Sequence, residues 1–261
     1  MRAEDSGRPP RRAIVRPPGR TYPQALTRLE PAPTVDLGAA RAQHATYTAA
    51  LVRLGLSVEA LPADDERPDA VFVQDRVAVF GGRAIVGPSA VAERRGEAEP
   101  IVSVLQKLFP VVTLRAPACL DWGDVLATEE ALFVGLSDRS NEAAVRQLRE
   151  LLAPEWMVEA VPTPPDLLHL LSGCAYLGGG DLLAVESLSE FGTARGLNVV
   201  PVPPEEVLSA NVLSLGQDVI VPAGYPETAT SIEATGRRTH PVPVGEFEKR
   251  DGGVTCLSVL Y

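Results

Sequence analysis

Residues 179–185 read GGDLLAV, in which an aspartate introduces an apolar run of the length expected for a buried strand. Similar segments occur three more times, as QDRVAVF at 74–80, WGDVLAT at 122–128 and GQDVIVP at 216–222. Successive aspartates of these segments are 49, 57 and 37 residues apart, at Asp75, Asp124, Asp181 and Asp218. Spacings of this size are typical of repeated supersecondary units. The pattern therefore indicates α/β units repeated around an axis, although ordinary α/β alternation would produce a similar pattern.

Helix-like and strand-like segments alternate along the rest of the chain. Residues 37–54 have a helical pattern that ends at Gly55, and residues 57–61 read as a strand. Ser140 is typical of a helix N-cap, because the segment after it carries an apolar stripe. No linker-like stretch interrupts the alternation. The sequence thus predicts one α/β domain over residues 1–261, with a flexible start at residues 1–12.

The composition limits the classes of function. A formal net charge of -10 disfavours nucleic-acid binding, because phosphate groups would be repelled, and it favours a small cationic substrate. Apolar runs are shorter than the roughly 18 residues of a membrane span, and the N-terminal residues lack the apolar core of a signal peptide. Three cysteines in 261 residues indicate a reducing environment rather than a disulfide framework. We therefore expect a cytoplasmic protein that binds neither nucleic acid nor membranes.

Cys256 and His169 are the candidates for chemistry, although each has a structural interpretation. A cysteine in a C-terminal strand, like a histidine in an apolar segment such as HLLSGC, is more often a core residue. The two residues are informative together, because a nucleophilic thiolate works with a nearby group that transfers protons. His44 is expected to be solvated on the polar side of a helix, and His240 has no evident role in its proline-flanked loop.

The segment CLDWGDVL places Asp121 and Asp124 on either side of a glycine. Such a turn can direct one carboxylate into a pocket while the other accepts hydrogen bonds from backbone amides. An ordinary Asp-Gly turn has the same pattern, so the spacing alone leaves both interpretations open.

Several segments closely resemble those of the dimethylarginine dimethylaminohydrolase family. They occur in the family's order from near residue 40 to the C-terminus, as LGLSVEALPADDERPDAVFVQD, CLDWGDVL, LFVGLSDRSNEA, HLLSGC and KRDGGVTCLSVL. HLLSGC and DGGVTCLSV are specific when they are found together. The resemblance implies the pentein fold, an α/β propeller of five ββαβ units with pseudo-fivefold symmetry.

The resemblance also implies roles for individual residues. Cys256 matches the nucleophile, His169 the general acid and base, and Asp121 the carboxylate that orients the histidine. The matched substrate-binding residues are Asp75 and Asp251 at the guanidinium with Gln74 beside them, Asp69 near the α-amino group, Arg94 and Arg139 at the α-carboxylate, and a lid backbone around Leu26. These residue types suit their roles, because carboxylates hold a guanidinium and arginines hold a carboxylate with paired hydrogen bonds.

Two positions depart from the family pattern and leave the preferred substrate open. Gln74 stands where the family commonly has glutamate, which removes a negative charge beside the guanidinium. Trp122 replaces the first glycine of a usual GGD, and its ring would either narrow the pocket or pack outward.

The implied reaction is hydrolysis of dimethyl- or monomethyl-L-arginine to L-citrulline and an alkylamine, through a covalent thiouronium on Cys256. Alternatives on the same fold are arginine deiminase chemistry, which releases ammonia, transfer of the amidino group to another amine, and a non-catalytic interaction protein. The chain is short for an arginine deiminase. No metal or organic cofactor is implied, and Cys119 and Cys174 are expected in the core. The expected partner is a small guanidino amino acid, bound by a monomer or homodimer.

Overall fold

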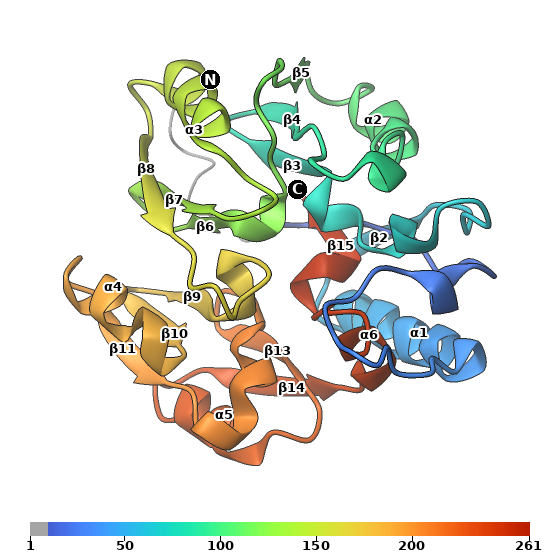
Figure 1. The fold of residues 1–261 in the computed structure, drawn as a ribbon. Helices are drawn as coiled ribbons and strands as arrows, with labels where there is room; N and C mark the ends of the chain where they lie inside the picture. Colours follow the sequence, from blue (N-terminus) through green and yellow to red (C-terminus); the bar gives the residue numbers. More distant parts are fainter. Residues whose placement is uncertain (1–9) are drawn as a thin grey trace.

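The computed structural model describes residues 10–261, and within them fifteen strands form five three-stranded sheets. Figure 1 shows these sheets arranged as a ring around a central axis, with helices on the outside. In each sheet the middle strand is antiparallel to one neighbour and parallel to the other. A helix connects each parallel pair, because parallel strands need a long crossover. The expected ring of five ββαβ units is confirmed.

The units follow the chain in order. The first contains β15 (Ser258–Leu260), β1 (Arg12–Val15), α1 (Leu37–Arg53) and β2 (Ser57–Ala60). The second contains β3 (Val77–Phe80), β4 (Arg83–Val86), α2 (Glu99–Leu105) and β5 (Val111–Thr113). The third contains β6 (Val125–Ala127), β7 (Ala131–Leu136), α3 (Glu142–Leu152) and β8 (Met157–Pro162). The fourth contains β9 (Cys174–Gly178), β10 (Asp181–Ala184), α4 (Ser189–Thr193) and β11 (Asn198–Pro201). The fifth contains β12 (Leu213–Leu215), β13 (Asp218–Pro222), α5 (Pro226–Glu233) and β14 (Arg238–Val242), and α6 (Gly245–Glu248) follows it.

The two ends of the chain close the ring. β15 pairs antiparallel with β1, so the C-terminal strand completes the unit that the N-terminal strand begins. Arg12 departs from the expected flexible start, because it pairs with Ser57 in the ladder between β1 and β2 and its N–H donates to the carbonyl of Tyr261 at 2.8 Å. The rest of that prediction lies mostly at residues 1–9, outside the described residues.

The core lies between the sheets and their helices. The middle strands are covered on both faces and therefore read as continuous apolar runs. In β10, for example, Leu182, Leu183 and Ala184 are all fully buried. No helix within residues 10–261 combines the length and the apolar character that crossing a membrane would require.

The aspartate repeat marks two different positions of the unit. Asp75 and Asp124 end the 3-10 turns that come before a unit's first strand, whereas Asp181 and Asp218 begin a middle strand. The repeat therefore indicated the right architecture, but its irregular spacing arises because non-equivalent positions were compared.

Two local predictions are wrong. The N-cap of α3 is Asn141, whose side chain accepts from the N–H of Ala144 at 3.1 Å, while Ser140 donates its hydroxyl to Asp124 at 2.7 Å. His44 is buried rather than solvated, because α6 covers this side of α1. The centroid of the Phe247 ring lies 6.4 Å from the centroid of the His44 ring. Burial lowers the pKa of His44 to about 4, so the side chain is neutral at physiological pH.

Candidate active site

A short 3-10 turn precedes the first strand of each of the five units that the structure describes. These turns are η9 (Thr255–Leu257), η3 (Val73–Asp75), η5 (Trp122–Asp124), η6 (Leu170–Ser172) and η8 (Pro204–Ala210). Cys256 and Asp75 lie within two of them, and Asp121 and His169 are the N-cap residues of two others. The ring therefore collects these four side chains from four different units.

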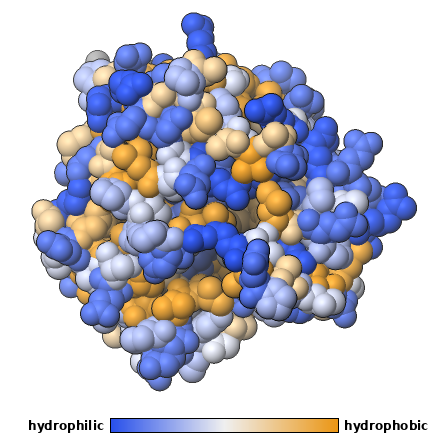
Figure 2. Space-filling view, in the orientation of Figure 1, coloured by the Kyte–Doolittle hydropathy of each residue, from blue (hydrophilic) through white to orange (hydrophobic). Residues whose placement is uncertain are grey.

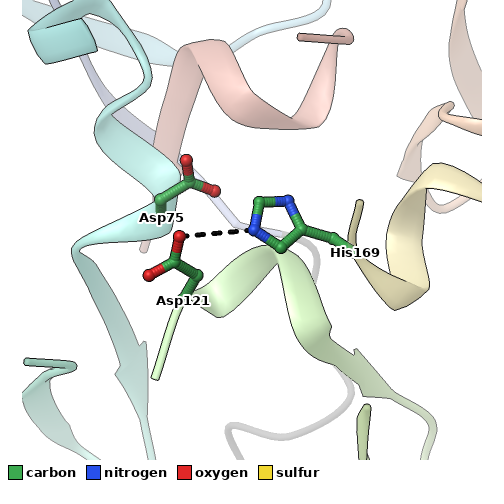
Figure 3. Close-up of side chains that lie close together, drawn as sticks. All are labelled: Asp75, Asp121 and His169. Carbon is green, nitrogen blue, oxygen red and sulfur yellow. Dashed lines mark hydrogen bonds and ion pairs between the residues drawn. The ribbon is translucent and has the colours of Figure 1, made fainter. Parts of the chain in front are cut away.

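His169 and Asp121 form the central polar pair. The Nε2 atom of His169 lies 3.3 Å from Oδ2 of Asp121. Asp75, at the end of η3, lies close to both side chains (Figure 3). Burial alone would lower the pKa of His169, but the hydrogen bond to Asp121 and the negative charge of Asp75 raise it above its ordinary value. This pKa favours an imidazolium that can donate a proton.

Cys256 reaches the same space as His169. Both residues line a cavity of about 150 Å³, and the Cys256 side chain is buried. Burial and the charge of Asp75 raise the pKa of Cys256 to about 12, so the free protein holds a neutral thiol at physiological pH. A cation bound in the cavity would favour the thiolate, because an opposite charge nearby stabilises the ionised form. The prediction that Cys256 lies in the C-terminal strand is wrong, because Cys256 belongs to η9 and the strand β15 begins only at Ser258.

The predicted substrate-binding residues converge on this cavity. Its wall includes Leu26, Asp69, Asp75, Arg94, Arg139 and Asp251. Gln74 does not line it, and lies behind Asp75 with its Nε2 donating to the carbonyl of Trp122 at 3.0 Å. The Trp122 ring points away from the cavity and packs in the core, where its indole N–H donates to the carbonyl of Ile85. It therefore does not narrow the cavity.

Arg94 and Arg139 differ in how they are engaged. Arg94 forms ion pairs with Asp75 at 2.8 Å and Glu97 at 2.9 Å. Arg139 has a buried Nη1 without a hydrogen-bond partner among the described residues. Arg139 therefore has a donor that is free to bind a substrate, whereas Arg94 is engaged by carboxylates of the protein and also fixes the position of Asp75.

The segment around Leu26 is held across the cavity by two carboxylates. The N–H of Leu26 donates to Asp69 at 3.3 Å, and the N–H of Arg28 donates to Asp251 at 2.6 Å. The Arg28 guanidinium also donates to the carbonyl of Pro165 at 2.8 Å. Asp251 adopts a left-handed backbone with φ of 56°, which is unusual for a residue other than glycine. These contacts hold the segment around Leu26 at the cavity wall, and its role as a lid stays a prediction.

Sequence reasoning missed two buried charges that support these side chains, Arg76 and Glu97. Arg76 pairs with the Asp121 carboxylate, and Glu97 pairs with Arg94. Asp124, by contrast, was one of the two acids that the sequence singled out, and it accepts from a backbone amide, the N–H of Leu170 at 3.0 Å, which fixes the turn that carries His169. The available signal was the position of Arg76, a cation between Asp75 and an apolar strand.

Asp75, Asp121 and His169 each offer an atom that can bind a metal ion, and these atoms all lie within 4.8 Å of one another. However, Arg76 and Arg94 form ion pairs with the two carboxylates. Two guanidinium groups at this distance oppose a further cation, so the donor set does not fit a metal site well.

Gly123 is required for close packing behind His169. A Cβ atom at this position would lie 2.8 Å from Nδ1 of His169 and 3.1 Å from Oδ1 of Asp75. We expect Gly123→Ala to displace the imidazole and to lower kcat about 100-fold, the cost typical of a misplaced catalytic group.

Gly192→Ala in α4 is the matched control for this prediction. Its Cβ would also meet neighbours at 2.8 Å, namely the side chains of Leu182 and Val199 in the core. Both variants should unfold more easily by about 1–3 kcal/mol because of overpacking. Steady-state kinetics and thermal melts separate the effects, and equal losses of activity in both variants would contradict a specific role for Gly123.

Comparisons with known proteins show which family the chain resembles in sequence. A family model described as N,N dimethylarginine dimethylhydrolase, eukaryotic, matches residues 33–163. The N(G),N(G)-dimethylarginine dimethylaminohydrolase of Pseudomonas aeruginosa is 33% identical over 250 residues, which cover 95% of this chain and 98% of the relative. The Streptomyces coelicolor protein of the same name is 35% identical over 255 residues, which cover 96% and 97%.

Solved structures show the same fold. A mutant of the Pseudomonas aeruginosa enzyme complexed with citrulline has a TM-score of 0.91 at 32% identity, covering 97% of this chain and 99% of that chain. The N-terminal domain of ArgZ, a cyanobacterial arginine dihydrolase, has a TM-score of 0.85 at 18% identity, covering 95% and 96%, and supports the fold alone. By sequence identity along nearly its whole length, the chain belongs to the dimethylarginine dimethylaminohydrolase family.

Proposed function

We propose that this chain hydrolyses Nω-methylated L-arginine to L-citrulline and an alkylamine. The observation that carries the proposal is the cavity shared by Cys256 and His169, whose wall combines carboxylates with Arg139. Carboxylates suit the guanidinium of the substrate, and a guanidinium from the protein suits its α-carboxylate. The family relationship supports the same activity. We also propose that residues 1–261 form a single catalytic domain that acts in the cytoplasm.

In the proposed first step, the bound guanidinium favours ionisation of Cys256, and the thiol proton leaves to water, because His169 already carries its proton. The thiolate attacks the guanidino carbon. The carbon–nitrogen bond to the alkylamine then breaks as the His169 imidazolium gives its proton to the departing nitrogen, leaving a cationic thiouronium on Cys256 and a neutral imidazole. Asp121 stabilises the imidazolium, because it accepts the hydrogen bond from Nε2.

In the proposed second step, His169 removes a proton from water, and the resulting hydroxide attacks the thiouronium carbon. The carbon–sulfur bond breaks, citrulline forms and the Cys256 thiol regains a proton. Substrate positioning would come from Asp75 and Asp251 at the guanidinium, Asp69 at the α-amino group, and Arg139 with Arg94 at the α-carboxylate. Leu26 would cover the bound substrate through its backbone.

Incubation with dimethylarginine, monomethylarginine and arginine tests the proposed function. The expected products from the methylated substrates are citrulline with dimethylamine or methylamine. Ammonia and citrulline from plain arginine as the preferred reaction would instead indicate arginine deiminase chemistry. Absence of turnover with all three compounds would contradict hydrolysis of these substrates.

Gln74→Glu is expected to alter substrate selectivity. Residue 74 does not line the cavity, so the added charge would act at a distance, by attracting the cationic guanidinium that Asp75 faces. We expect the ratio of kcat/KM for monomethyl- and dimethylarginine to change about fivefold. The variant also loses the hydrogen bond to the Trp122 carbonyl, which costs about 1 kcal/mol of stability.

Gln74→Met separates these two effects, because it removes the hydrogen bond without adding charge. Its stability should fall, while its selectivity should stay close to that of the native chain. An unchanged selectivity ratio in Gln74→Glu would contradict the role assigned to this charge.

A further inference from the structure

A second and larger cavity adjoins the first. It has a volume of about 820 Å³ and shares Cys256 and His169 with the smaller cavity. We call it the apolar groove, after the side chains of Leu167, Leu171, Val185, Val202, Val207 and Leu208 that line it. Val207 and Leu208 are 48% and 54% exposed, a large fraction for apolar side chains. Figure 2 shows hydrophobic surface in the hollow of this face, bordered by hydrophilic side chains.

The two cavities meet at the atoms that would react. Asp69, Arg94 and Arg139 line only the smaller cavity, so the amino acid end of a substrate belongs there. His169, which would protonate the departing nitrogen, also lines the groove. A substituent on the departing nitrogen would therefore extend into the groove.

The chemistry of the groove fits a longer alkyl group better than a methyl group. A methyl group would occupy a small part of the groove volume, whereas a longer alkyl chain would cover the exposed side chains of Val207 and Leu208. Asp166 and Glu186 lie on the groove wall as well. Their negative charges suit an amine that becomes protonated after it departs.

We propose that the apolar groove binds apolar substituents longer than methyl on the terminal nitrogen of the guanidino substrate. This inference rests on the proposed function. It extends the substrate class to arginines that carry an alkyl group of about four carbons on the terminal nitrogen. The steps are unchanged: the carbon–nitrogen bond breaks, His169 protonates the alkylamine, and water releases the same citrulline from Cys256.

Binding and turnover of Nω-butyl- and Nω-methyl-L-arginine test this inference. In Cys256→Ser protein, calorimetry should give a dissociation constant about 30-fold lower for the butyl compound, because it has three additional methylenes and burial of each favours binding about threefold. The native chain should release butylamine and citrulline with kcat/KM at least equal to that for the methyl compound.

Leu208→Gln should reduce the preference for the butyl compound about fivefold, because it places a neutral polar group in the groove. Leu108→Gln is the matched control, since Leu108 is 49% exposed but does not line either cavity, and it should leave the preference unchanged. Thermal melts check that both variants fold.

The outcomes separate this inference from the proposed function. Turnover of the methyl compound with at least tenfold weaker binding of the butyl compound would overturn the groove assignment alone. An equal loss of preference in Leu208→Gln and Leu108→Gln would also overturn it. Failure to bind or hydrolyse either compound would overturn both proposals.

Discussion

Cys256→Ser is expected to abolish citrulline formation while the protein stays folded. A serine hydroxyl at this position is far less acidic and less nucleophilic than a thiolate, so kcat should fall by about 10⁴-fold or more. The exchange is nearly isosteric, and Cys256 is one member of an extensive core cluster around the first unit. Steady-state kinetics should therefore show a loss that thermal melts and circular dichroism do not.

Binding and adduct formation make this prediction specific. The serine variant should retain affinity for dimethylarginine, because the carboxylates and Arg139 remain in the cavity. Acid quenching of the native chain during turnover should yield a Cys256 peptide that carries the thiouronium adduct, which mass spectrometry detects. The variant should lack this adduct.

Cys119→Ser is the control for cysteine substitution. Cys119 is half-buried and lines neither cavity. Its substitution should leave kcat within about twofold of the native value, as expected for a residue outside the site. Citrulline formation by Cys256→Ser above 1% of the native rate would contradict covalent catalysis by this residue.

The sequence predicted the individual units better than the strand pairing that closes them into a ring. Local hydrophobic patterns indicate strands such as β10 and helices such as α1, because these depend on neighbouring residues. The pairing of β1 with β15 joins residues such as Ile14 and Val259, which no local pattern connects. The resemblance to a ring-shaped family supplied that information.

The site was accessible to the sequence mainly through the family resemblance. Cys256 and His169 are 8% and 5% exposed, so their burial matches that of ordinary core residues. Only their meeting at one cavity distinguishes them, and that depends on the ring. The catalytic and binding roles of the individual residues stay predictions, which the variants described above can test.

The buried charges Arg76 and Glu97 illustrate what sequence patterns miss. Hydropathy predicts that arginine and glutamate are exposed, because isolated charges are costly to bury. In the fold they are 2% exposed and are held by charged partners from neighbouring turns. Arg76 pairs with Asp121 across the second and third units, so this pair appears only when the units are assembled, whereas Glu97 pairs with Arg94 three residues earlier in its own unit.

Asp121→Asn tests this network and the state of His169 together. The Asp121 carboxylate raises the pKa of His169, because it accepts its hydrogen bond, and it neutralises the buried Arg76. Removal of the charge should lower the pKa of His169. The imidazolium predominates below this pKa and is lost as the pH rises through it. The alkaline decline of kcat should therefore move to lower pH in the variant.

Asp121→Asn should also lower kcat about 100-fold, because the imidazole loses the group that orients it. The free energy of unfolding should fall by about 3 kcal/mol or more, since Arg76 is left as a buried and largely unpaired charge. Kinetics over a pH series and denaturant titrations measure these effects separately.

Asp181→Asn provides the matched control, because it breaks another ion pair, with Arg237 at 2.6 Å, away from both cavities. It should lose some stability while keeping the native pH profile, since no catalytic group contacts this pair. An unchanged alkaline limb in Asp121→Asn would mean that Asp121 does not control the protonation of His169. The distinction is informative because a purely structural aspartate would change stability without moving the pH profile, whereas an aspartate that holds a proton-transferring imidazole must move both.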